Sequence, residues 1–142
     1  MNERQRSVAR LMEGVRADVD DYHELRSMLS AQFGAALRHE TLVLTDLAER
    51  IVALTGRLEE RREERMALAR FLMGSGLPAA MPLLLEALPR TAREALEAWW
   101  GVLEDLVNEC KAQNMRNCRL MVEQHEIMQR VLDMEVDIYA PG

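Results

Sequence analysis

The chain of 142 residues contains few aromatic residues, which make up 4% of it, and only two cysteines. Two cysteines cannot supply the four ligands of a structural zinc site. Cys110 and Cys118 lie on one expected helix, where a rise of ~1.5 Å per residue puts their Cα atoms about 12 Å apart, too far for a disulfide. The sequence therefore excludes a disulfide scaffold and a zinc domain.

Targeting and membrane-spanning signals are also missing from the sequence. The first ten residues are highly charged, and no apolar segment typical of a signal peptide follows them. The longest apolar stretch, Leu77–Leu85, is too short to span a bilayer and contains Pro78 and Pro82. The net charge of −6 argues against a general nucleic-acid binder. We therefore expect a cytoplasmic protein with no transmembrane segment and no nucleic-acid partner.

Motifs that carry catalysis or bind metals are scarce. There is no glycine-rich phosphate loop, Walker motif or nucleophile elbow. A di-iron bundle needs a carboxylate residue three positions before a histidine on each of two helices. In this chain only Asp20 and His23 have that spacing. A helical enzyme rich in arginine, such as a chorismate mutase, stays an alternative because Arg61 and Arg65 fall on an apolar seam. The competing interpretation has their stems packing at a helix edge with the guanidinium groups in water, so we expect no enzyme, metal or cofactor.

The residues that are abundant are those of long packed helices. Leu, Ala, Met, Glu and Arg dominate, with 49% hydrophobic and 30% charged residues. Apolar residues recur at alternating steps of three and four from Val8 to Leu72 and from Ala92 to Val131, which predicts coiled-coil-like packing. The sequence thus predicts an all-α fold in one domain, residues 1–142.

Breaks in the pattern divide the domain into an elongated antiparallel hairpin or bundle of three main helices, at about 5–41, 46–73 and 91–133. A single first helix through residue 73 would be roughly 100 Å long. We place its break at 41–46, where β-branched residues cluster and Asp46 with Glu49 resembles a capping box. Thr91 and Glu94 resemble a second capping box, which predicts that the third helix begins there. We expect this helix to run antiparallel to the second.

The segments between and after these helices follow from glycine, proline and charge. Residues 74–90 form a glycine- and proline-punctuated connection that can hold one short helix over Pro82–Leu88. The run Glu59–Arg65 predicts a solvated face with local ion pairs. Residues 134–142 form an acidic tail.

Three amides interrupt the apolar seam of the third helix: Asn114, Asn117 and Gln124. A buried amide without a partner costs about 1–3 kcal/mol. One interpretation is that these amides fix the register of the helix against its neighbours. The other is that this half of the helix binds a segment of another protein.

The same helix carries a series of spaced residues that continues into the tail: Trp99, Leu103, Cys110, Asn114, Asn117, Leu120 and Ile138–Gly142. This series resembles the carboxyl-terminal pattern of the FlgN family of flagellar export chaperones. The family pattern has a tryptophan, a spaced leucine and cysteine, an N-x-x-N motif followed by a glycine, and an apolar-tyrosine-glycine tail. The earlier residues Glu49, Arg50, Leu54, Leu58 and Arg62 resemble the family's second helix. Two glycines of the pattern are replaced by the small residues Cys118 and Ala140.

The resemblance implies a cytoplasmic chaperone that binds hook–filament junction proteins and delivers them to the flagellar type III export gate at the membrane. An exported subunit would present an amphipathic helix, which docks in a groove between helices. The methionines Met115, Met121, Met128 and Met134 give such a surface an adaptable apolar lining. The client-binding residues would be Asn114, Asn117, Met121, Gln124, Met128 and Val131. The resemblance further suggests that Ile138 and Tyr139 dock on the export gate; folding back onto the bundle is the other interpretation of these two residues.

Three other classes stay open from the sequence. The seam can close against a second copy, giving a self-associating coiled-coil scaffold or a homodimer. The chain can be a chaperone for a different secreted substrate. A small all-helical enzyme is the last alternative.

Overall fold

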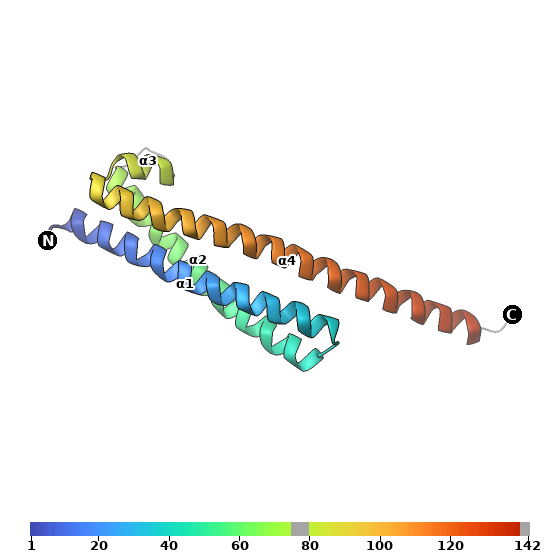
Figure 1. Cartoon of the computed structure of the whole chain (residues 1–142). Coiled ribbons are helices and arrows are strands. Elements are labelled where there is room, and N and C mark those ends of the chain that lie inside the picture. Colours follow the sequence, from blue (N-terminus) through green and yellow to red (C-terminus); the bar gives the residue numbers. More distant parts are fainter. Residues whose placement is uncertain (75–79, 140–142) are drawn as a thin grey trace.

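The computed structural model describes residues 1–74 and 80–139, with side chains described as far as Met134. The described residues form helices and no strands, which confirms the all-α prediction. Figure 1 shows α1 and α2 as an antiparallel hairpin, with α4 returning along α1 and parallel to it. The bounds are α1 Glu3–Leu37, α2 Thr41–Met73, α3 Met81–Glu86 and α4 Arg90–Tyr139.

The first helix begins two residues earlier than predicted, with a capping box that the sequence analysis missed. The side chain of Asn2 accepts a hydrogen bond from the backbone N–H of Gln5 at 2.8 Å, and the Gln5 side chain accepts from the backbone N–H of Asn2 at 3.1 Å. The neighbouring Arg4 donates to the carbonyls of Leu72, at 3.0 Å, and Ala87, at 3.1 Å. These carbonyls lie at helix ends, where the backbone lacks helical partners.

The turn between α1 and α2 lies at Arg38–Glu40, so the predicted break at 41–46 is wrong. His39 adopts a left-handed backbone, with φ 54°. Its N–H donates to Ala36 at 3.2 Å, and that of Glu40 donates to Ala35 at 2.9 Å. This pair of bonds is the Schellman arrangement, which ends a helix by satisfying its last carbonyls. The β-branched cluster instead lies in α2, where Asp46 does not cap the helix but pairs with Arg50 at 3.7 Å.

The second half of the chain follows the prediction with shifted boundaries. α2 ends at Met73 as predicted, and the short helix α3 covers Met81–Glu86 rather than 82–88. α4 begins at Arg90, so Thr91 lies inside its first turn, and Glu94 pairs with Arg90 at 3.0 Å. At its other end α4 continues to Tyr139, beyond the predicted end at 133.

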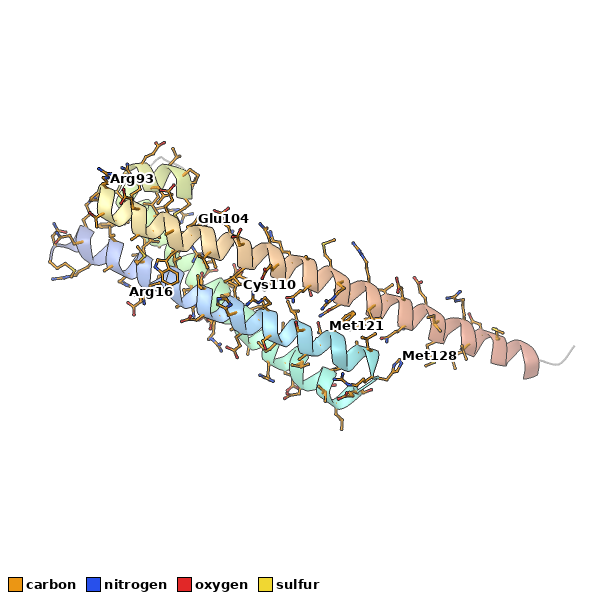
Figure 2. All side chains as sticks on the ribbon, viewed as in Figure 1. Arg16, Arg93, Glu104, Cys110, Met121 and Met128 are labelled. Carbon is orange, nitrogen blue, oxygen red and sulfur yellow. The ribbon has the colours of Figure 1, made fainter. Side chains whose placement is uncertain are left out.

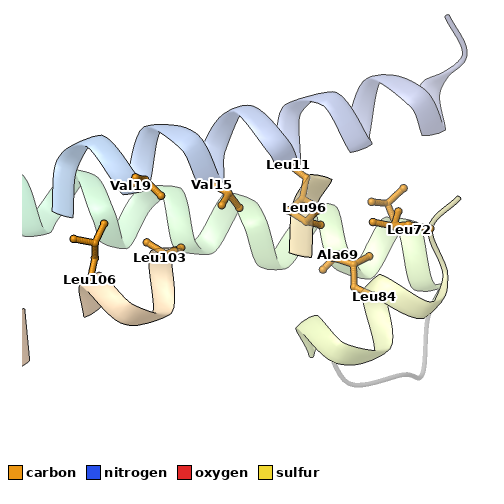
Figure 3. Close-up of a cluster of buried hydrophobic side chains, with 10 residues drawn as sticks. Leu11, Val15, Val19, Ala69, Leu72, Leu84, Leu96, Leu103 and Leu106 are labelled. Carbon is orange, nitrogen blue, oxygen red and sulfur yellow. The ribbon is translucent and has the colours of Figure 1, made fainter. Parts of the chain in front are cut away.

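α1 is the central helix, because α2 and α4 each pack on it. α4 runs antiparallel to α2 as predicted, but within the described residues the backbones of these two helices do not approach closely. One apolar cluster joins all four helices at the amino-terminal end of α1 (Figure 3), around Leu11, Val15, Leu72, Leu84 and Leu96. A second lies along the hairpin and includes Leu29, Leu54 and Cys110. Side chains of α2 and of α4 line the open space that remains between these two helices.

Candidate functional site

Three side chains of α4 bind backbone carbonyls of α1 at a constant separation in sequence. Asn117 Nδ2 donates to the carbonyl of Leu29 at 2.8 Å, and Gln124 Nε2 donates to that of Ala36 at 2.9 Å. The thiol of Cys110 approaches the carbonyl of Tyr22 at 3.6 Å. Each pair is 88 residues apart, and successive pairs are one heptad apart. The two parallel helices are therefore held in one coiled-coil register.

Asn117 is fully buried and fully bonded within the chain. Its exposure is 0%, and Nδ2 also donates to Gln32 Oε1 at 2.9 Å. Its oxygen accepts from Arg116, at 3.3 Å from Nη2, and that guanidinium stacks over the ring of Phe33 at 3.9 Å from the centroid. This arrangement favours register control for Asn117 and Gln124. Asn114, in contrast, is exposed.

Beyond Gln124, α4 projects past the end of the α1–α2 hairpin (Figure 1). We call residues 125–139 the α4 extension. Every side chain described in it, from His125 to Met134, is exposed. Figure 2 shows Met121 near the end of the hairpin and Met128 beyond it. At ~1.5 Å per residue the extension is about 22 Å long.

The exposed side chains of the α4 extension include five large apolar ones. Of the predicted residues, Met128 is 59% and Val131 49% exposed, whereas Met121 is half-buried at the base of the extension. The third of the five is Met134, one of the methionines expected to line this surface, at 63%; the prediction left out Ile127 and Leu132, which are 53% and 51% exposed. Ile127 and Leu132 directly adjoin the seam residues Met128 and Val131 in sequence, so a search for both neighbours of each seam position finds them. Together the five residues recur at helical spacing and form an apolar stripe.

The predicted docking residues Ile138 and Tyr139 belong to the last turn of α4 by their backbone. Their side chains lie outside those that the structure describes, as do Ala140, Pro141 and Gly142 entirely. The prediction that they dock on another protein therefore stays a prediction.

A partly buried ionic cluster joins α1 to α2 through Arg61 and Arg65, whereas the rest of the predicted solvated face over Glu59–Arg65 is exposed and contains the local ion pair Arg62–Glu59 at 3.4 Å. The Asp18 side chain is 2% exposed and accepts from Arg61 at 2.6 Å and from Arg65 at 2.5 Å. Asp21 accepts from Arg61 at 2.8 Å and lies 3.8 Å from Arg57. Burial disfavours the charged Arg61, but its hydrogen bonds to Asp18 and Asp21 outweigh burial and raise its pKa. The guanidinium groups of Arg61 and Arg65 thus bind carboxylates and do not project into water.

This cluster offers structural rather than catalytic chemistry. Arg65 also stacks over the Trp100 ring at 5.4 Å from its centroid, so its guanidinium group contacts both α1 and α4. Within residues 1–74 and 80–134, no cluster of three His, Cys, Asp or Glu side chains can hold a metal ion. None of the helices described is both long and apolar enough to cross a bilayer.

Comparison with known proteins identifies one family. The family model described as FlgN protein matches residues 1–135, which is most of the chain. No curated protein and no solved structure matches the chain significantly.

Proposed function

The chain belongs to the FlgN family of flagellar export chaperones, and from this premise we propose that the α4 extension binds the client. FlgN is a chaperone family and not an enzyme family. The clients we propose are the hook–filament junction proteins, kept unaggregated in the cytoplasm and delivered to the flagellar type III export gate. The observation that carries the proposal is the exposed apolar stripe of the α4 extension.

An amphipathic helix of the client suits this stripe. Ile127, Val131 and Met134 follow one another at steps of four and three, and Met128 and Leu132 lie beside them. A client helix that lays its own apolar face on these residues removes both surfaces from water, which favours the complex by about 25 cal/mol per Å² of apolar area buried and opposes the entropy lost on association. Unbranched methionines adapt to clients of different shape. The exposed stripe thus suits more than one junction protein.

The amides contribute to this site indirectly. Asn117 and Gln124 hold α4 on α1 and so fix where the α4 extension leaves the bundle. Met121 lies at that boundary, and the exposed Asn114 lies one heptad before it on α4. We propose that Met121, Met128 and Val131 contact the client, and that Asn114 lies at the edge of the contact.

Glutamate substitutions on and off the stripe test the proposal. Met128→Glu and Val131→Glu place a charge in the proposed contact, and each should weaken binding of a purified junction protein about tenfold or more. Val52→Glu is the matched control, since Val52 is 70% exposed on α2. Because all three side chains are already in water, the fold should survive, as circular dichroism can check. Calorimetric titration that gives all three variants the affinity of the unmodified chain would contradict the proposal.

We also propose that Tyr139, with Ile138, docks on the export gate once a client is bound. A tyrosine offers a large contact area with only two rotatable side-chain bonds to fix. Tyr139→Ala should leave the melting temperature and client affinity unchanged and should reduce gate binding and export. If the melting temperature instead drops by several degrees, this tyrosine packs on the bundle and the assignment is wrong.

A further inference from the structure

A groove runs between α2 and α4, the two long helices whose backbones do not approach each other closely. Three adjoining hollows of about 290, 280 and 200 Å³ make it up. Tyr22, Val107 and Lys111 are common to the first two, and Arg65 and Trp100 to the first and third. The three hollows therefore adjoin from α3 to the middle of α4, and the Arg65 side chain, which stacks over the Trp100 ring at 5.4 Å from its centroid, lines the junction of the first and the third.

The walls and floor of the groove have the chemistry of a helix-binding site. α1 supplies an apolar floor through Leu25 and Leu29, and α2 supplies Ile51 and Met66. Three helices that leave such a groove open can accept a fourth helix, which completes a four-helix arrangement. Along α4 the groove extends from Trp100 to Asn114, which at ~1.5 Å per residue is about 21 Å. This length matches the α4 extension.

The charges at the groove and on the α4 extension are opposite in sign. Basic residues that line the groove outnumber acidic ones, with Arg62, Arg65 and Lys111 against Glu104. Arg62 also pairs with Glu59 at 3.4 Å, and Arg65 belongs to the ionic cluster, in which Arg57, Arg61 and Arg65 face the carboxylates of Asp18 and Asp21. The sequence of the extension carries the acidic residues Glu126, Asp133, Glu135 and Asp137 against the single basic residue Arg130.

We propose that the groove binds the α4 extension of a second copy of this chain. In such a dimer each copy places its extension in the groove of the other, so the contact closes with two-fold symmetry and does not continue into a filament. The apolar stripe covers the groove floor, and the acidic residues of the extension approach Arg62 and Lys111. Complementary charges of this kind set the orientation and the partner.

Two-fold symmetry predicts where the two copies of α4 cross. If Val107, in the groove, faces Val131 of the second copy, the axis passes midway between them, at residue 119 of α4. Cys118 lies beside that position and is an exposed free thiol, whereas Cys110 is buried. The thiols of the two copies should therefore come close together in the dimer.

The proposed dimer also regulates client binding. It buries the surface that we assign to the client, so client and second copy compete for the same extension. This consequence alone rests on the proposed function. Self-association is measured without any client, so a failure of the dimer proposal can be distinguished from a failure of the proposed client binding.

The first experiment is light scattering of the full chain over a concentration series. The mass should rise toward twice the 16.3 kDa of one chain. Val131→Glu, on the extension, and Lys111→Glu, on the groove rim, should each raise the dissociation constant about tenfold, and Val52→Glu should not. A mass that stays at one chain at every concentration overturns the proposal, and so does a dimer unaffected by both variants.

Mixing and cross-linking test the arrangement itself. In a dimer of one Val131→Glu chain with one Lys111→Glu chain, the intact groove of the first binds the intact extension of the second. An equimolar mixture of the two variants should therefore dimerise better than either variant alone. A short bismaleimide should join Cys118 of the two copies, and this product should disappear with Val131→Glu or Cys118→Ser. If the mixture dimerises no better, or if a client and not a second copy protects the groove from hydrogen exchange, the occupant we propose is wrong.

Discussion

Asn117 on α4 donates to the backbone carbonyl of Leu29 on α1 at 2.8 Å, across 88 residues of sequence. The carbonyl of Leu29 lies inside a helix, so its oxygen accepts this bond in addition to its helical one. Gln124 repeats the relationship one heptad later, on Ala36 at the end of α1. The two amides thus act as fixed points of register between parallel helices, and they determine how much of α4 extends past the hairpin.

Asn117→Asp should destabilise the chain by at least about 2 kcal/mol, because it removes both N–H donors and turns a carboxylate toward carbonyl oxygens in a buried site. Asn114→Asp makes the same chemical change at an exposed position of α4 and should change stability little. Urea unfolding of the two variants measures the difference. Equal stabilities would show that the amide of Asn117 does not fix the register.

Asp18→Ala should cost about 3–5 kcal/mol, because it leaves the partly buried Arg61 and Arg65 without their shared carboxylate. Asp20→Ala is the matched control, since Asp20 is exposed on the same helix. Denaturant unfolding should separate the two variants clearly. If Asp18→Ala is as stable as its control, the ionic cluster does not contribute to folding.

The two cysteines should react with thiol reagents at very different rates. Burial raises the pKa of the Cys110 thiol above its ordinary value, which lowers the fraction of reactive thiolate at a given pH. Cys118 is exposed. Ellman's reagent should therefore modify one thiol rapidly in the native chain and the second only after unfolding, as the variants Cys110→Ala and Cys118→Ser can assign. Two rapid phases in the native chain would mean that Cys110 is not protected by α1.

Stability should decline at alkaline pH. Burial is the main cause that raises the pKa of Tyr22 and of Cys110, and the nearby Asp18 raises that of Tyr22 further. Both groups therefore hold their protons more tightly in the folded chain than in the unfolded chain. Their contribution to the free energy of unfolding is fully present below the ordinary pKa values, 10.0 for Tyr22 and 9.0 for Cys110, and it is lost as pH rises through the raised pKa values. Tyr22→Phe should reduce this decline, as melting temperatures between neutral and alkaline pH can show. An identical decline in the variant would exclude Tyr22 as a source.

The sequence predicted the helices from their three-and-four periodicity, but it could not locate the turn between α1 and α2. That turn depends on His39 in a left-handed conformation, at a position where glycine is the usual signal. The ion pairs of Asp18 with Arg61 and Arg65 were missed for a different reason. They join residues 43 and 47 positions apart, and only the packed register of α1 and α2 brings them together.

The sequence predicted part of the candidate site, and its apolar residues and its amides show why the rest was not predicted. Met128 and Val131 follow from the seam, and the end of α1 at Leu37 explains why they are exposed. Asn117 and Gln124 also follow from the seam as polar residues in apolar positions. Their partners on α1 could not be read from spacing, because a seam amide can equally bond to its own chain or to another protein.

Amide hydrogen exchange of the chain, with and without a purified hook–filament junction protein, tests the central claim most directly. At a concentration where the chain alone is monomeric, residues 125–139 should exchange fast, because no other helix covers their described side chains. We predict that the client slows exchange most strongly in this segment and leaves the turn at 38–40 unchanged. Protection confined to the α1–α2 hairpin, with residues 125–139 still exchanging fast, would contradict the assignment of the α4 extension as the client-binding surface.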